Sequence, residues 1–266
     1  MLRLWLLDLD REPAPADARD PATSGERARS ARFRRPRDGR RFLRRRAFLR
    51  KLLGAETGVA PHELMLATGP GGKPFLPGGP SFSTSHSDRW LLVGLCATGR
   101  LGVDLEVDVP VDEAPEIARA HFTERERAAL EDEDPDAFLR LWTRKEALIK
   151  ALGGGLSIPL DAFSVRAGRA SGQALLEIDL PGERAENWHV ASIPAGPGLH
   201  AAIAMDVPRP CVRFVTPTTA ACAASERPGA AGPAPGARHA TEPSTTLSIG
   251  VRRSASRATN NARLPR

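Results

Sequence analysis

The 266-residue chain has few cysteines and lacks any long hydrophobic run. Cys96, Cys211 and Cys222 are an odd number, lie far apart and have neither metal-ligand nor disulfide spacing. They exclude a disulfide-stabilised scaffold and favour a reducing compartment. The longest apolar run, Leu91–Ala97, is far shorter than the roughly 20 residues of a membrane-spanning helix, and Asp8 interrupts the apolar N-terminus before any cleavage site. We therefore expect neither a membrane span nor a secretory signal, and a cytoplasmic location.

The positive charge is concentrated in two segments. The chain carries 38 Lys and Arg against 32 Asp and Glu, a formal net charge of +6. Residues 27–51 contain 12 Arg and one Lys against one Asp, and residues 208–266 contain nine Arg against two Glu, so the remainder is acidic. This distribution favours a focused anion site over a general nucleic-acid surface. A solvated arginine-rich helix face is the alternative, because these arginines alternate with apolar residues at helical spacing.

The order of expected elements predicts an α+β fold in two halves, residues 1–98 and 99–207, followed by a tail. We expect strands at 2–8, 64–66 and 89–97 and a helix at 39–53 in the first half. In the second half we expect a strand at 101–109, a helix opened by the capping box of Thr123 and Glu126, a helix from 134 to 152, and antiparallel strands at 162–166, 174–178, 188–193 and 199–205. Residues 208–266, rich in Pro, Gly, Ala, Ser and Thr, are expected to be disordered.

Two acidic residues alternate with apolar residues in the segment 101–107. In a strand, Asp104 and Glu106 would point from one face and the apolar residues from the other. Carboxylates about 7 Å apart repel each other unless solvent or a cation balances them, and their oxygens suit a hard ion such as Mg²⁺. An ordinary acidic outer face is the alternative, and on spacing alone it is the commoner explanation.

Two further segments bring polar groups together. Trp142, Glu146 and Lys150 recur every four residues and would share one side of a helix, although an ordinary exposed Glu–Lys pair explains the spacing equally well. The segments 72–75 and 82–87 place Lys73, several small hydroxyls and His86 between turn-forming residues. Such a cluster suits a phosphate, although alone it is also an ordinary polar loop.

Taken together and in this order, these segments resemble the 4′-phosphopantetheinyl transferases, in their larger single-chain Sfp-type form. The family signatures are a Gly-x-Asp-x-Glu strand and a Trp-x-x-Lys-Glu-Ala/Ser-x-x-Lys helix, matched here by Gly102–Glu106 and Trp142–Lys150. Segments 72–74, 85–87 and 156–165 also fit, so the resemblance covers about residues 1–207. Two departures lie at Gly154, where the family often has Lys, and at Ser83, where it often has Asn.

The resemblance implies Mg²⁺-dependent transfer of the phosphopantetheine arm of coenzyme A to a serine of an apo acyl or peptidyl carrier protein. It implies Asp104, Glu106 and Glu146 as magnesium ligands. Glu146, directly or through a metal-bound water, would be the base. Lys150 would stabilise or protonate the departing adenosine 3′,5′-bisphosphate. The implied coenzyme A contacts are Lys73, Ser85, His86 and Lys145, assisted by Arg40 or Arg41.

The resemblance also implies a pseudo-twofold pair of halves, each a small antiparallel sheet on a long helix, with coenzyme A in the cleft between them. We expect a monomer without a nucleic-acid or membrane partner. A nucleic-acid-binding protein that uses residues 27–51 and the tail is the alternative, but it leaves Asp104, Glu106 and Glu146 without a role. A silent relative that only docks on carrier proteins is disfavoured by the intact Asp104, Glu146 and Lys150.

Overall fold

The computed structural model describes residues 1–11, 21–132, 134–169, 173–207 and 210–215. The first half contains β1 (Leu2–Asp8), α1 (Ser24–Ala31), α2 (Pro36–Thr57), β2 (Ala67–Thr68), β3 (Pro74–Phe75), β4 (Ser81–Ser87) and β5 (Trp90–Cys96). The second half contains β6 (Leu101–Val107), α3 (Ala114–His121), α4 (Glu124–Asp132), α5 (Ala137–Leu152), η1 (Gly155–Ser157), η2 (Leu160–Ala162), β7 (Phe163–Val165), β8 (Leu175–Ile178), η3 (Ala185–Asn187), β9 (His189–Ser192) and β10 (Leu199–Met205). The last strand is β11 (Val212–Phe214).

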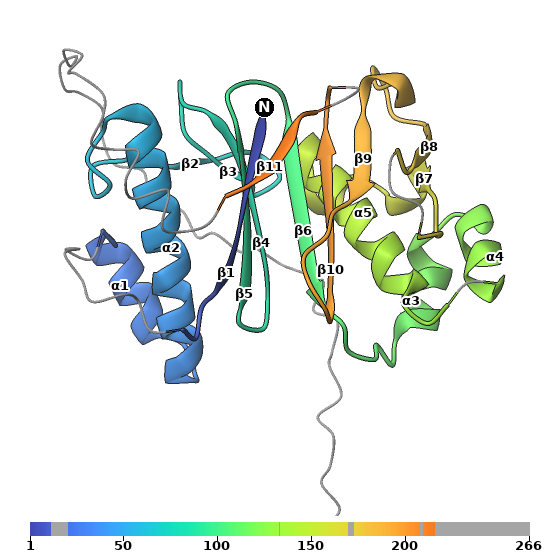
Figure 1. Ribbon diagram of the computed structural model, residues 1–266, viewed down its shortest axis with the longest axis horizontal. Helices are drawn as coiled ribbons and strands as arrows, with labels where there is room; N and C mark the ends of the chain where they lie inside the picture. The colour runs from blue at the N-terminus through green and yellow to red at the C-terminus, as the bar shows by residue number, and fades with distance from the viewer. Residues whose placement is uncertain (12–20, 133, 170–172, 208–209, 216–266) are drawn as a thin grey trace, which may run out of the picture.

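Two larger sheets lie between the two longest helices. One sheet has the order β11-β1-β5-β4 and the other β6-β10-β9, while β2 with β3 and β7 with β8 form two-stranded sheets. All strand pairs are antiparallel except β1 and β11. Figure 1 shows α2 outside the first large sheet and α5 outside the second. The mixed architecture confirms the expected α+β class.

The apolar residues of these elements form a core in three layers. Alternate residues of β1 point to opposite faces, so Trp5 packs with α2 residues such as Leu53, while Leu4 packs between the two sheets with Val103 of β6. The third cluster surrounds α5 and includes Leu148. Because both faces of β1 and β5 are covered, these strands are almost continuously apolar in sequence.

Several sequence-based expectations for local structure are confirmed. Leu101, Val103 and Leu105 lie together in the core between the sheets, as the alternation in 101–107 predicts. The capping box is present: the Glu126 amide donates to Thr123 Oγ1 over 3.3 Å, and the Thr123 amide donates to Glu126 Oε2 over 2.9 Å.

Other expectations differ from the structure. The polar segment 82–87 is strand β4, and residues 64–66 are not a strand, since β2 begins at Ala67. The first long helix continues past Gly54 and stops at Gly58, whose φ of 74° is typical of a helix C-terminus. Helix α5 begins at Ala137 instead of 134, and α1 and α3 have no counterpart in the sequence-based prediction.

The expected disorder from residue 208 onward also differs at its beginning. Val212–Phe214 form β11, and the Val215 amide donates to the Leu4 carbonyl over 2.8 Å. Residues 216–266 lie outside the described residues. Every helix among the described residues is too short or too polar to span a lipid bilayer.

Candidate active site

The two large sheets are in contact along β4 and β6. Serine hydroxyl groups of β4 accept hydrogen bonds from backbone amides of β6 there, in place of the backbone carbonyls of a paired strand. The Val103 amide donates to Ser83 Oγ over 3.1 Å, and the Val107 amide donates to Ser87 Oγ over 3.0 Å. We call this contact, formed by Ser83, Ser85 and Ser87 of β4 against β6, the serine seam. It fixes how the polar residues of β4 lie against those of β6.

The two acidic residues of β6 lie on this seam. Ser85 Oγ donates to Asp104 Oδ1 over 2.7 Å, and Ser87 Oγ donates to Glu106 Oε2 over 2.7 Å. Lys150 of α5 donates to Asp104 Oδ1 over 2.6 Å and to Ser85 Oγ over 2.9 Å. Strand β6 and helix α5, distant in sequence, therefore bring Asp104 and Lys150 together.

Electrostatics link Glu146 of α5 to the same group. Burial and the nearby negative charges of Asp104 and Glu106 raise the pKa of Glu146 to about 7, although Lys150 opposes the shift. Burial tends to lower the pKa of Lys150, but Asp104 and Glu146 outweigh it and raise that pKa. The site therefore holds more negative charge than one lysine comfortably balances.

The residues present fit a cation in one specific respect. Asp104 Oδ2 is buried and has no hydrogen-bond partner, whereas Oδ1 is bound by Ser85 and Lys150. A buried carboxylate oxygen without a donor is unfavourable, and a hard cation would complete its coordination. Asp104 could thus offer Oδ2 to Mg²⁺, with Glu106 and Glu146 as the other oxygen donors.

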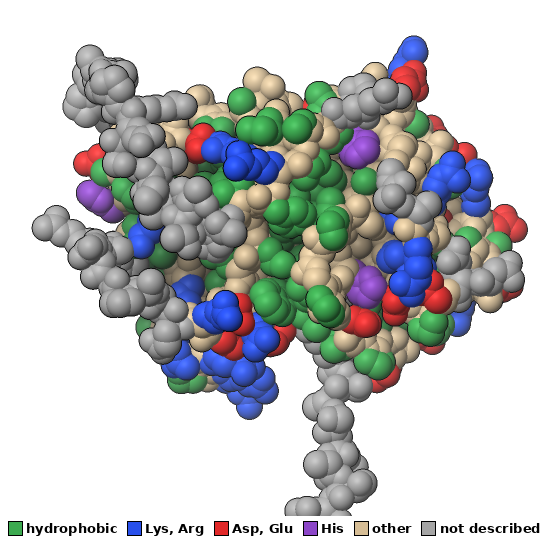
Figure 2. Space-filling model, in the orientation of Figure 1, with side chains coloured by type: hydrophobic (Ala, Val, Ile, Leu, Met, Phe, Trp, Pro, Cys, Tyr) green, Lys and Arg blue, Asp and Glu red, His purple; other side chains and the backbone are tan. Residues whose placement is uncertain are grey.

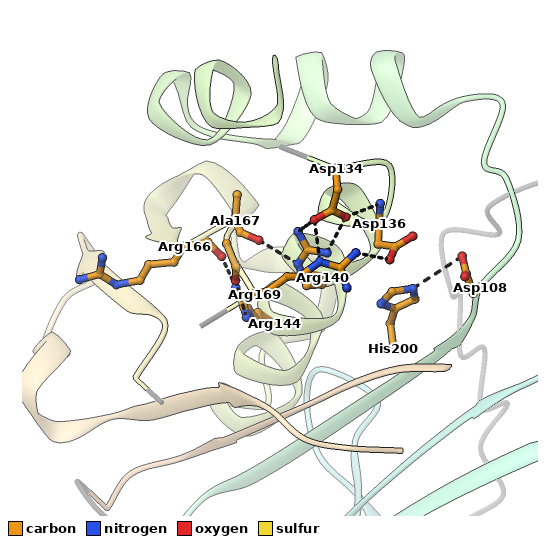
Figure 3. Close-up of polar contacts among 10 residues, drawn as sticks. Asp108, Asp134, Asp136, Arg140, Arg144, Arg166, Ala167, Arg169 and His200 are labelled. Atoms are coloured by element: carbon orange, nitrogen blue, oxygen red, sulfur yellow. Dashed lines mark hydrogen bonds and ion pairs between the residues drawn. The ribbon is translucent and has the colours of Figure 1, made fainter. Parts of the chain in front are cut away.

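A tighter group of metal-type ligands lies elsewhere. Among the described residues, Asp108, Asp136 and His200 each place one ligand atom within 4.8 Å of the others, and the oxygens of Asp104, Glu106 and Glu146 do not all meet that limit. His200 faces Asp108 at 3.6 Å, while Arg169 donates to Asp136 Oδ2 over 2.9 Å (Figure 3). Asp108 and Asp136 therefore already have side-chain partners in His200 and Arg169.

The predicted coenzyme A contacts are dispersed. Lys73 donates to the Leu101 carbonyl over 2.7 Å, and burial lowers its pKa to about 8. Ser85 lies in the serine seam, whereas His86, next to it in β4, points to the other face and is exposed. Lys73, Ser85 and His86 are therefore not one cluster as they stand.

The arginine-rich segment contains both exposed and structural residues. Arg40 is exposed, and Figure 2 shows Lys and Arg side chains gathered over the beginning of α2. Arg41, in contrast, is buried and donates to Asp10 and to Asp88, and the hydrogen bond to Asp10 is the main reason that its pKa is raised. The sequence-based assignment of Arg41 to coenzyme A is therefore replaced by a structural role that ties α2 to the ends of β1 and β4.

A pocket of about 340 Å³ lies between the two N-terminal helices and the β2–β3 segment. Its lining residues include Arg29, Arg46, Gly72 and Pro74. The guanidinium groups of Arg29 and Arg45 lie 5.2 and 5.8 Å from the ring centre of Phe42, another lining residue.

Arg45 adds to the positive charge beside this pocket. Burial, with Arg46 and Arg29 close by, lowers the pKa of Arg45 to about 10, and its buried Nε has no hydrogen-bond partner. Sequence reasoning did not single out Arg29, Arg45 or Arg46, and the only signal for them is the excess of arginine in residues 27–51.

The ammonium of Lys145 is bound inside the protein, which corrects its sequence-based assignment to coenzyme A. Its side chain is fully buried, and Nζ donates to both carboxylate oxygens of Glu126 over 2.7 Å and to the Phe163 carbonyl over 2.8 Å. The ammonium also lies 4.5 Å from the centre of the Phe163 ring. All three N–H groups are used, so Lys145 ties α5 to α4 and β7 and cannot contact coenzyme A.

Comparisons with known proteins show the family to which this chain belongs. A sequence model of the 4′-phosphopantetheinyl transferase superfamily matches residues 100–204, which include β6 and α5. The chain is 36% identical over 163 residues to a putative 4′-phosphopantetheinyl transferase, slr0495, of Synechocystis, covering 58% of this chain and 66% of the relative, just under two thirds. It is 34% identical to the 4′-phosphopantetheinyl transferases HetI of Nostoc and Sfp of Bacillus subtilis, covering 59% and 58% of this chain and 70% and 69% of the relatives. The chain therefore belongs to the 4′-phosphopantetheinyl transferase superfamily.

Proposed function

We propose that this protein transfers the 4′-phosphopantetheine arm of coenzyme A to a serine of an apo acyl or peptidyl carrier protein, with Mg²⁺ as cofactor. Adenosine 3′,5′-bisphosphate is the second product, and the enzyme acts as a monomer in the cytoplasm. The proposal includes the pseudo-twofold relation of residues 1–98 and 99–207, and its support is that each half contributes a sheet and a long helix.

The observation that carries the proposal is the convergence at the serine seam. Asp104 and Glu106 of β6 and Glu146 and Lys150 of α5 form one electrostatic group. Both elements lie within the segment that matches the superfamily. In the proposal, Asp104, Glu106 and Glu146 hold the Mg²⁺ ion. When bound, the ion would neutralise the negative charge that develops on the diphosphate in the transition state of the transfer.

The protein's own residues then carry the proton and the leaving group. The oxygen of the carrier serine attacks the phosphorus that bears the pantetheine arm, and the bond from that phosphorus to the bridging oxygen of the diphosphate breaks. Glu146 accepts the serine proton, directly or through a water. Lys150, whose side chain is 29% exposed, stabilises the negative charge of the departing bisphosphate.

The arginine-lined pocket supports a polyanionic substrate. Its positive charge comes from Arg29, Arg46 and Arg50 of the two N-terminal helices, with Arg45 nearby, and it exceeds the single negative charge of Glu26, which pairs with Arg46 and Arg50. Gly72 and Pro74, from a segment assigned to coenzyme A by resemblance, line the same pocket. We propose that the nucleotide end of coenzyme A lies here, with Lys73 and the exposed Arg40 as further phosphate contacts.

Intact-mass measurement of apo carrier proteins tests the transferase proposal. Purified full-length protein, Mg²⁺, coenzyme A and a panel of apo carrier proteins should give a mass increase equal to one phosphopantetheine arm. Glu146→Gln should abolish the increase, whereas Glu124→Gln, at an exposed position of α4, should not. If no carrier gains mass under conditions in which a relative is active, and the protein instead binds DNA or RNA with steep salt dependence, the nucleic-acid alternative replaces the proposal.

A further inference from the structure

Strand β4 supplies one hydroxyl donor to each acidic residue of β6. Ser85 Oγ donates to Asp104 Oδ1 and Ser87 Oγ donates to Glu106 Oε2, both over 2.7 Å. Because side chains of a strand alternate, Ser83, Ser85 and Ser87 share the face of β4 that lies against β6. All three are buried.

We propose that Ser85 and Ser87 are positioning residues that orient Asp104 and Glu106 for a divalent cation. This inference rests on the proposed function, in which those two carboxylates are ligands. It assigns to β4 a role in metal binding, in place of a role for Ser85 in phosphate binding. Ser83 has no such role, although it belongs to the same seam.

The direction of each hydroxyl proton follows from its other contact. A serine hydroxyl has one hydrogen to donate. Ser87 accepts from the Val107 amide and Ser85 accepts from the Lys150 ammonium, so the hydrogen of each serine is left for the carboxylate. Each carboxylate therefore accepts a hydrogen bond from a hydroxyl group whose orientation is fixed by its second contact.

These donors select which oxygen is presented to an ion. Asp104 Oδ1 is occupied by Ser85 and Lys150, whereas Oδ2 is buried without a hydrogen-bond partner. Outer-shell hydrogen bonds of this kind fix the geometry of metal-binding carboxylates, and their loss typically lowers metal affinity by about 10- to 100-fold. We expect the same range for loss of either serine hydroxyl.

Ser83 provides a matched control within the same strand. It accepts from the Val103 amide over 3.1 Å, as Ser87 does from the Val107 amide, so at the seam it binds the backbone of β6. Ser83→Ala therefore removes a seam hydroxyl without touching Asp104 or Glu106. Any effect that comes only from weakening the contact of β4 with β6 should appear in this variant too.

The test titrates Mn²⁺ into the full-length chain and measures free Mn²⁺ by electron paramagnetic resonance. Ser85→Ala and Ser87→Ala should each weaken Mn²⁺ binding by about 10-fold or more, while Ser83→Ala should bind as the wild type does. Ser85→Cys and Ser87→Cys form a second pair that keeps the shape of the side chain, with a somewhat larger γ atom that donates weakly, and they should weaken binding similarly. Thermal melting of each variant verifies that it is folded.

Three results would overturn the inference. One is unchanged Mn²⁺ affinity in the Ser85 and Ser87 variants while Asp104→Asn weakens it. Another is equal weakening by Ser83→Ala. The third is Mn²⁺ binding that is lost in His200→Ala but not in Asp104→Asn, which would place the ion at Asp108, Asp136 and His200. Failure of the proposed function is distinguishable, since the wild type would then bind Mn²⁺ in the expected serine-dependent way and still transfer no phosphopantetheine.

Discussion

Gly102 of β6 and Ala147 of α5 are in direct backbone contact. A Cβ atom at position 102 would lie 1.8 Å from the Ala147 carbonyl oxygen and 2.6 Å from the Ala151 amide nitrogen. Only glycine permits this approach, and the approach lets Lys150 of α5 reach Asp104 of β6. The glycine that opens the Gly-x-Asp-x-Glu motif therefore has a packing role, while the two acids carry the charge.

We expect Gly102→Ala to destabilise the protein strongly. Relieving a 1.8 Å contact requires α5 to move away from β6. Overpacking of this kind typically lowers the unfolding free energy by about 1 to 3 kcal/mol, and occasionally by more. Urea denaturation followed by circular dichroism measures the loss. Gly25→Ala is the control, because its Cβ would meet nothing closer than Thr23 Oγ1 at 3.9 Å. Equal stability of the two variants would contradict the packing role.

The sequence predicts an element well where one face packs on an apolar core. In β6 the alternation of apolar and acidic residues was sufficient, because Val103 lies in the core and Asp104 does not face it. Strand β4 escaped prediction because its inward face is made of serines that bind polar groups of β6. Apart from Phe82, the residues on both faces of β4 are polar. The segment therefore lacks the alternation of apolar and polar residues that predicts a strand.

The candidate site shows the same limit. Local spacing placed Glu146 and Lys150 on one side of α5, and both belong to the charged group with Asp104. Spacing gave no information on partners distant in sequence. Glu126, 19 residues before Lys145, completes a fully buried ion pair, and Arg41 binds Asp10 and Asp88. Such pairs occupy positively charged side chains that, from composition alone, would be expected to bind a substrate.

We expect Lys145→Met to act on stability and not on coenzyme A binding. The substitution leaves the buried Glu126 carboxylate without its cation, and breaking a buried pair typically costs about 3 to 5 kcal/mol of unfolding free energy. Replacing both partners, as in Glu126→Gln with Lys145→Met, should recover part of the loss. Lys51→Met, at an exposed position of α2, is the control and should melt as the wild type does. A large rise in the KM for coenzyme A with unchanged melting would instead restore the assignment of Lys145 to the substrate.

We expect Glu146→Gln to stabilise the metal-free protein at alkaline but not at acidic pH. Burial and the charge of Asp104 raise the pKa of Glu146 from 4.5 to about 7 in the folded state. Between these values the folded protein holds a proton that the unfolded chain has lost, so the stability contributed by this group falls as the pH rises through that window. The loss above about pH 7 is at most about 3 kcal/mol. Glutamine, being neutral, avoids it.

Thermal melting with a chelator at about pH 5 and about pH 8 measures this difference. The variant should melt higher than the wild type at about pH 8 and no higher at about pH 5, and saturating Mg²⁺ should remove its advantage, because the ion would offset the repulsion among Glu146, Asp104 and Glu106. Glu124→Gln, on the exposed side of α4, should show no such pH dependence. An advantage of equal size at both pH values would mean that neither burial nor the charges of Asp104 and Glu106 oppose the ionisation of Glu146 in the folded protein. An advantage that survives Mg²⁺ would mean that these three carboxylates do not share the ion.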